Sequence, residues 1–207
     1  MIDYALARIH ARHGARPEAR AWAMVHAAVT LGSLLENARG SALESWIAGL
    51  DPATPRAEAE RLLHERLRGR IAEAARWVPE AWRPAVMHTA SLIDLPARQR
   101  RLRAGGDEER AAAARREWLA AWRDLRPGCT ADEHAALEEL VRTVEAHLER
   151  FAHASTDDAE SLRLALRLRV ESLFRRHALG PAAVFDHLLL LALEAERLRA
   201  EIMGRCP

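Results

Sequence analysis

The sequence predicts an all-α fold, a multi-helix bundle of about ten helices in one or two modules. Three observations lead to this fold class. Ala, Leu, Glu and Arg dominate the 207 residues, with only 10 Gly and 9 Pro, and such a composition favours helices over strands. Apolar residues recur at helical spacings of three and four in several long segments. No segment alternates apolar and polar residues for long enough to form a strand.

The N-terminal region is predicted to form two helices, one before Gly14 and one between Pro17 and Gly40. A helix over residues 3–13 should end at Gly14. Pro17 suits a first helical turn and opens a segment that we expect to run, as one helix, to Ala38. Gly40 should end that helix.

A short helix and then a long one follow. Ser41 and Glu44 have the spacing of a capping box and predict a short helix through Trp46 and Ile47. After the turn that contains Pro55, an apolar stripe at the helical period predicts a long helix. This stripe consists of Leu63, Leu67, Ile71, Ala74 and Val78.

Prolines and glycines organise the middle of the chain. Pro84 should begin a helix that reaches Ile93, and Pro96 can begin another short one. Gly105 and Gly106 mark the best boundary between two halves. We therefore expect an N-terminal helical module at 1–104 and a C-terminal helical module at 107–207.

The C-terminal half predicts four helices. One covers 107–125, and the next begins at the capping box of Thr130 and Glu133. Another is capped within 155–158, and the last runs from Gly180-Pro181 to about Met203. The last helix is apolar nearly all round at its start, so we expect that part to be a buried central helix. Its stripe is Val184, Leu188, Leu191, Ala195, Leu198 and Ile202.

Charge and hydropathy exclude several classes of protein. The net charge is +1 and all 31 basic residues are Arg; 1–103 carries +5 and 104–207 carries −4. This polarity could orient the protein against a charged partner, or it could reflect two solvated surfaces.

The longest apolar run, 188–193, is far too short to span a membrane. The N-terminus does not resemble a signal peptide, and two cysteines are too few for a disulfide scaffold. We expect a cytoplasmic protein without direct membrane insertion.

Histidines and one buried acid are the candidate chemical groups. His10 and His13 could share a helix face and bind a metal, with His26 as a third ligand, or form a solvated face. Asp186 and His187 interrupt the most apolar stretch, where a buried pair could be catalytic or could hydrogen-bond to a neighbouring loop.

Neither enzymatic nor nucleic-acid motifs are found. The chain has no Gly-rich phosphate loop, no nucleophile elbow and no carboxylate constellation. We therefore expect no enzyme activity, no catalytic or metal-binding residue and no cofactor. The arginines in 98–103 could contact phosphate, and the six Trp could stack on a ligand, but no helix-turn-helix pattern accompanies them. We expect no nucleic-acid partner.

Both ends of the chain carry motifs of one family. Residues 4–9 read Tyr-Ala-Leu-Ala-Arg-Ile, and residues 194–204 contain Glu followed by Leu198-Arg199 and a final Gly. These motifs resemble the central-stalk subunit of the rotary V-type ATPases of eukaryotes and the A-type ATPases of archaea. Residues 31–50 and 60–67 resemble the first helical module of that family. Asp94 and the segment 101–104 resemble a further family segment. Arg197 replaces an Asn of the family motif, and the chain has room for two of the family's three modules.

The resemblance implies a mechanical function. The family protein is non-catalytic and connects the rotor stalk to the membrane ring of proteolipid subunits, which couples ATP hydrolysis to ion transport. Stalk and ring subunits would then be the protein partners, and the chain could be held at the membrane surface through them. The resemblance also implies that Tyr4 and Arg8 pack the first helix onto the last. Glu194, Leu198 and Arg199 would belong to the same joint.

Two other interpretations remain open. The chain could be a stand-alone helical scaffold or assembly factor with no link to an ATPase. It could also be a metal- or small-molecule-binding bundle that uses the His-rich first helix or a pocket near Asp186.

Overall fold

The computed structural model describes residues 2–152 and 154–207 and confirms the all-α prediction. The described residues form eleven α-helices and two short 3-10 helices, with no strand among them. In chain order the helices are α1 (Asp3–Gly14), α2 (Ala19–His26), α3 (Leu31–Ala38), α4 (Glu44–Ile47), α5 (Arg56–Trp77), η1 (Glu80–Trp82), α6 (Arg83–His88), η2 (Thr89–Ile93), α7 (Leu95–Ala104), α8 (Glu108–Asp124), α9 (Ala131–Ala152), α10 (Thr156–Arg176) and α11 (Ala182–Met203).

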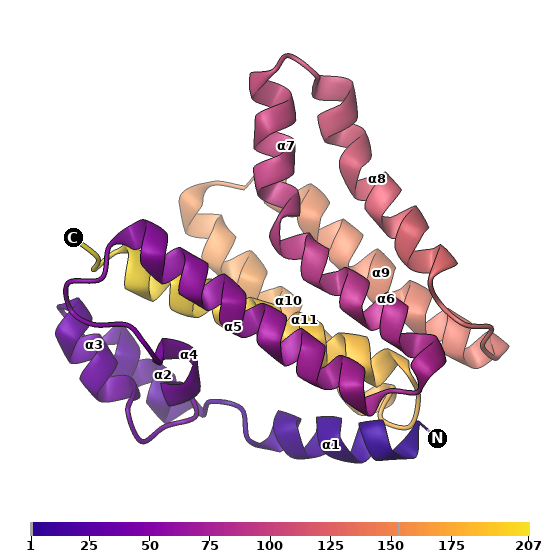
Figure 1. The fold of residues 1–207 in the computed structure, drawn as a ribbon, viewed down its shortest axis with the longest axis horizontal. Helices are drawn as coiled ribbons and strands as arrows, with labels where there is room; N and C mark the ends of the chain where they lie inside the picture. Colours follow the sequence, from indigo (N-terminus) through magenta and orange to yellow (C-terminus); the bar gives the residue numbers. More distant parts are fainter. Residues whose placement is uncertain (1, 153) are drawn as a thin grey trace.

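Two long antiparallel helices, α5 and α11, form the centre of the bundle (Figure 1). The predicted stripe of α5 is buried along its length, and the first seven residues of α11 are all buried. The start of α11 is therefore the central buried helix that its apolar sequence predicts.

The other helices cover this pair on different sides (Figure 1). Helix α1 packs against α5 and α11, and the short helices α2–α4 gather near the C-terminal end of α11. Helices α9 and α10 lie behind the pair and also contact α11. Helices α7 and α8 form a hairpin that projects from the bundle and turns at Gly106, whose φ of 79° suits glycine.

The expectation of one continuous helix over 17–38 is wrong, because the segment contains two helices, α2 and α3. Thr30 has an extended backbone, and its hydroxyl accepts a hydrogen bond from the Ser33 amide, while the Ser33 hydroxyl accepts one from the Thr30 amide. This reciprocal cap starts a new helix within an apolar pattern that continues across the break. Helix α2 also begins at Ala19, so Pro17 lies in the linker before it.

Two further boundaries differ from the prediction. The capping box of Ser41 and Glu44 does not form at the start of α4, since Ser41 bonds to the amide of Leu43 and Glu44 reaches back to the amide of Gly40. The predicted helix over 84–93 is α-helical only to His88 and continues as the 3-10 helix η2. Short helices often adopt such tight turns at their ends.

Other predicted caps form as expected. The hydroxyl of Thr130 accepts from the amide of Glu133, whose carboxylate accepts from the amide of Thr130. Ser155 caps α10 through the amide of Asp158. Buried side chains of both halves contribute to one hydrophobic cluster, and the division into modules at 1–104 and 107–207 stays a prediction.

Candidate functional site

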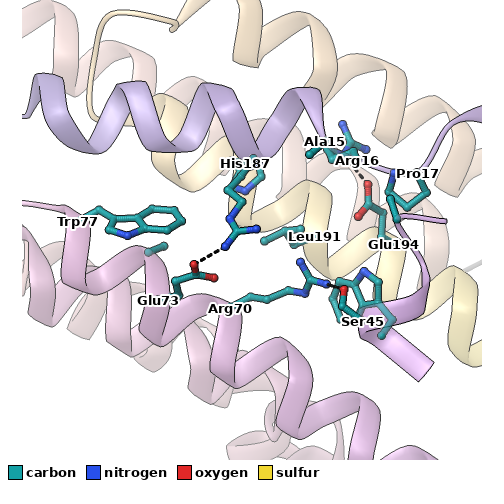
Figure 2. Close-up of a pocket in the computed structure, with 14 residues that line it drawn as sticks. Ala15, Arg16, Pro17, Ser45, Arg70, Glu73, Trp77, His187, Leu191 and Glu194 are labelled. Carbon is teal, nitrogen blue, oxygen red and sulfur yellow. Dashed lines mark hydrogen bonds and ion pairs between the residues drawn. The ribbon is translucent and has the colours of Figure 1, made fainter. Parts of the chain in front are cut away.

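A polar pocket of about 190 Å³ lies between α1, α4, α5 and α11 (Figure 2). The linker Ala15–Pro17, which joins α1 to α2, also contributes to its lining. The pocket combines charged side chains with two indole rings, whereas most of the surrounding core is apolar. This mixture makes it the strongest candidate for a functional site.

Two antiparallel helices provide facing walls of the pocket. On α5, Arg70, Glu73 and Trp77 are spaced by three and four residues, so they share one face of the helix. On α11, His187 and Glu194 share a face for the same reason. Helical periodicity alone therefore concentrates these polar groups on the two surfaces that meet at the pocket.

Two of the pocket's three arginines are neutralised by carboxylates. Arg12, at the end of α1, pairs with Glu73 at 2.6 Å (Figure 2). Arg16, in the linker, donates from Nε to Oε1 of Glu194 and lies 3.7 Å from Glu171. The Arg16 and Glu194 side chains are 13% and 5% exposed, so this ion pair is largely removed from water.

Arg70 is the third arginine, and it has no carboxylate within 4 Å among the described residues. Its guanidinium lies over the Trp46 ring at 4.1 Å and donates to the hydroxyl of Ser45 at 2.7 Å. The side chain is half-buried, and burial lowers the pKa of Arg70. The pocket therefore contains a partly desolvated cation held in place by neutral groups.

His187 and Glu194 each present an unused polar atom. Nδ1 of His187 and Oε2 of Glu194 are buried without a hydrogen-bond partner in the described residues. Burial, reinforced by neighbouring His13 and Arg16, lowers the pKa of His187 to about 3. Burial raises the pKa of Glu194 against the opposing effect of Arg16. At neutral pH His187 is therefore neutral and is available only as a hydrogen-bonding group.

The residues implied by the family resemblance are spread over several places. Tyr4 is 60% exposed, and Arg8 is exposed with its guanidinium 5.2 Å from the Trp77 ring of α5. Leu198 is fully buried, and Arg199 pairs with Glu60 at 2.8 Å. Of the five, only Glu194 lines the pocket. Helix α1 does pack on α11, while its buried residues are Ala5, Leu6 and Ile9.

The candidate pair Asp186 and His187 is buried, but the two side chains contact different parts of the protein. Asp186 accepts a hydrogen bond from Nδ1 of His177 at 2.8 Å. His187 lines the pocket instead. Burial raises the pKa of Asp186 to about 6. The hydrogen bond to the loop after α10 is thus one of the two alternatives that the sequence allowed for this pair.

The proposed histidine ligands do not converge on one point. His10 bonds the carbonyl of Ala178, His13 stacks on Phe174, and His26 bonds Glu201. In the described part of the chain, no three His, Cys, Asp or Glu side chains are placed to hold one metal ion.

The basic stretch 98–103 lies on α7 in the projecting hairpin. Arg98 pairs with Glu117 at 3.2 Å and Arg103 with Glu108 at 3.3 Å, and Arg101 is exposed. The side chain of Arg100 lies outside the described residues. Neighbouring acids on α8 therefore reduce the positive charge of this patch.

The sequence reasoning did not identify Arg12, Arg16, Arg70, Glu73 or Ser45 as site residues. The one available indication was the 3–4 spacing of Arg70, Glu73 and Trp77 on a helix whose other face is apolar. The same spacing occurs on solvated helix faces, and the chain has 31 arginines. Only the meeting of α5 with α11 and the 15–17 linker distinguishes these residues.

No helix within the described residues has the length and apolar character required to cross a bilayer. Comparisons of the chain with protein-family models, with curated proteins and with solved structures found no match.

Proposed function

We propose that this protein is a non-catalytic binding protein whose polar pocket takes a small molecule bearing one carboxylate or another singly charged anionic group. The observation that carries the proposal is the environment of Arg70. A half-buried guanidinium that forms no direct ion pair, and feels Glu194 and Glu73 only from beyond 4 Å, is costly, and a bound anion would supply a charge-assisted hydrogen bond. Trp46 and Ser45 hold this guanidinium in position before the ligand arrives.

The charge of the pocket fits a ligand with one negative charge. Arg12, Arg16 and Arg70 face Glu73 and Glu194, and His187 is neutral because its pKa is about 3. The lining therefore carries a formal charge of +1. The volume of about 190 Å³ corresponds to roughly six water molecules of liquid. A small monocarboxylate meets both limits.

Binding without catalysis is favoured by the titration of the pocket groups. A general acid or base works best when its pKa lies near the working pH. The pKa of His187, about 3, is far from neutrality, and the carboxylate of Glu194 is engaged by Arg16. His187 is therefore not suited to exchange protons with a ligand at neutral pH, and Oε1 of Glu194 is committed to Arg16.

Calorimetric titration with acetate, benzoate and inorganic phosphate tests the proposal. The Arg70→Gln variant should bind the preferred anion roughly 10- to 100-fold more weakly, the range expected from losing one charged hydrogen bond. Arg76→Gln is the matched control, because Arg76 is an exposed arginine of the same helix outside the pocket. The uncharged amides of the two carboxylic acids control for the anionic charge. Equal binding by the two variants, or equal binding of acid and amide, would refute anion binding at Arg70.

A second proposal is the rotor-coupling role that the family resemblance implies. It is supported by the packing of α1, which carries the N-terminal motif, against α11, which carries the C-terminal motif, and by the Arg16–Glu194 pair between the linker after α1 and α11, although the two ends of the chain lie at opposite ends of the bundle (Figure 1). Affinity purification from native membranes tests this role, with the tag alone as control. Specific recovery of proteolipid ring and stalk subunits would support it. Recovery of the protein alone, or with an unrelated soluble partner, would contradict it.

A further inference from the structure

Two carboxylates of the polar pocket act on Arg70 without pairing with it. Glu194 and Glu73 both favour its charged form, but in the described residues neither lies within 4 Å of its guanidinium. Arg12 pairs with Glu73 at 2.6 Å instead, and Arg16 engages Glu194 in the same way. Both of these arginines belong to the end of α1 and the linker after it. One short stretch of chain therefore holds both acids away from Arg70.

The Arg12–Glu73 pair is much less buried than the Arg16–Glu194 pair. The side chains of Arg12 and Glu73 are 51% and 27% exposed. The corresponding fractions of the Arg16–Glu194 pair are 13% and 5%. Water and salt weaken an exposed ion pair, so its partners separate at little cost. Glu73 is thus the acid that can change its partner.

Helical spacing places Glu73 within reach of Arg70. The two residues are three positions apart in α5, where side chains on one face have Cβ atoms roughly 5–6 Å apart. Both side chains extend from α5 into the pocket (Figure 2). Rotation about its side-chain bonds brings the Glu73 carboxylate toward the guanidinium without movement of the helix.

Arg12 determines which partner Glu73 takes. It neutralises the Glu73 carboxylate, and its own charge acts unfavourably on that of Arg70. The site therefore keeps an excess of positive charge, which attracts an anion. Without Arg12, the partly desolvated guanidinium of Arg70 faces an unpaired carboxylate one turn away. A charge-assisted hydrogen bond between them then satisfies both groups.

We propose that Arg12 and Glu73 regulate the anion site: while they pair, Arg70 is open to the ligand, and when they separate, Glu73 moves to Arg70 and excludes the anion. Arg12 is then a positioning residue that acts through Glu73. Because Arg12 lies on α1, the packing of that helix against α5 controls the site. This inference rests on the proposed binding of an anion at Arg70.

A double-variant cycle tests the regulation by calorimetric titration with acetate, benzoate and inorganic phosphate. Arg12→Gln should weaken the preferred anion roughly 5- to 20-fold, because the anion must displace Glu73. In the Glu73→Gln background the competitor is gone, so Arg12→Gln should weaken binding by less than roughly threefold, through loss of charge alone. Arg12→Lys keeps the charge and should bind within roughly twofold of the wild type.

Arg8→Gln is the matched control. Arg8 is an exposed arginine one turn earlier on α1, and its guanidinium lies over the Trp77 ring. Its replacement removes the same charge from the same helix without releasing Glu73. It should therefore change binding by less than roughly twofold, with or without Glu73→Gln. Circular dichroism verifies that the variants are folded, which the exposure of Arg12 and Glu73 favours.

The exchange of partners is also measurable without a ligand. The guanidinium NMR signals of Arg70, identified by their absence from Arg70→Gln, should move downfield in Arg12→Gln. The reason is that a carboxylate accepts a stronger hydrogen bond than the Ser45 hydroxyl does. Adding Glu73→Gln to Arg12→Gln should return the signals to their wild-type positions.

Two results would overturn this inference while anion binding stands. One is an equal fold-loss from Arg12→Gln with and without Glu73→Gln, which loss of charge alone would produce. The other is a set of Arg70 signals in Arg12→Gln that do not respond to Glu73→Gln. If none of the three anions binds the wild type, the proposed function fails, and Arg70 signals that shift as expected would still show the exchange of partners.

Discussion

Removing one partner of the Arg16–Glu194 ion pair should be among the most destabilising single changes in this fold. The pair connects the linker after α1 to the middle of α11, and its side chains are 13% and 5% exposed. Removing one partner of a buried pair leaves the other charge in a medium that solvates it poorly. We therefore predict that Glu194→Leu and Arg16→Met each lower the free energy of unfolding by about 3 kcal/mol.

The two single variants should differ in their response to pH. In Glu194→Leu, Arg16 keeps a second carboxylate, Glu171, at 3.7 Å. This remaining interaction should make the loss of unfolding free energy smaller. In Arg16→Met, Glu194 loses its main cation, and burial already raises the pKa of this carboxyl group. Acid should therefore reduce the penalty of Arg16→Met, because a protonated Glu194 is cheaper to bury than a charged one.

The double variant is the decisive comparison. Replacing both charges by apolar side chains removes the desolvation cost of both. We expect Arg16→Met with Glu194→Leu to lose far less than the roughly 6 kcal/mol that additive single effects would give, since residues in direct contact are coupled. Urea denaturation followed by circular dichroism at pH 7 measures all four proteins. Single losses below about 0.5 kcal/mol, or strictly additive losses, would refute the buried-pair reasoning.

Three further predictions concern other parts of the structure. Arg8→Ala should lower the free energy of unfolding by only about 0.5–1 kcal/mol, because it removes the contact of the guanidinium with the Trp77 ring. The exposed Tyr4→Ala should lower it by less than about 0.5 kcal/mol. Thermal melting checks both, and a loss of several kcal/mol from Tyr4→Ala would contradict its exposure. The His187 pKa is lowered from 6.5 to about 3, so stability should fall as pH drops below 6.5, where the unfolded chain binds the proton first. In His187→Gln that decline should be shallower by about 1.4 kcal/mol per pH unit. Urea denaturation of the wild type and the variant between pH 4 and 7 measures it, and parallel curves of stability against pH would exclude His187 as the cause. Thr30→Ala should destabilise the protein by about 1 kcal/mol through loss of the α3 cap, whereas an unchanged urea midpoint would mean that the cap is dispensable.

Local sequence patterns determined most of the helices. The apolar stripe of α5, the cap at Thr130 and the stop and start at Gly180-Pro181 all operate within one or two turns of chain, so neighbouring residues are enough to predict them. The break between α2 and α3 was missed because Thr30 lies within a continuous apolar pattern. There a single pair of hydroxyl–amide hydrogen bonds outweighs the periodicity.

The sequence by itself determined the all-α fold class and the burial of the first part of α11, because composition and helical period are local properties of the chain. Only the tertiary structure decided which polar residues belong together. Arg16 and Glu194 are separated by 178 positions, yet they form a pair, and Arg70 differs from the other arginines only in the surroundings that α4 and α11 give it. Likewise, Glu73 pairs with Arg12 of α1, although Arg70 lies three residues away in its own helix. Contacts between distant segments depend on the packing of whole helices, and no local pattern specifies that packing.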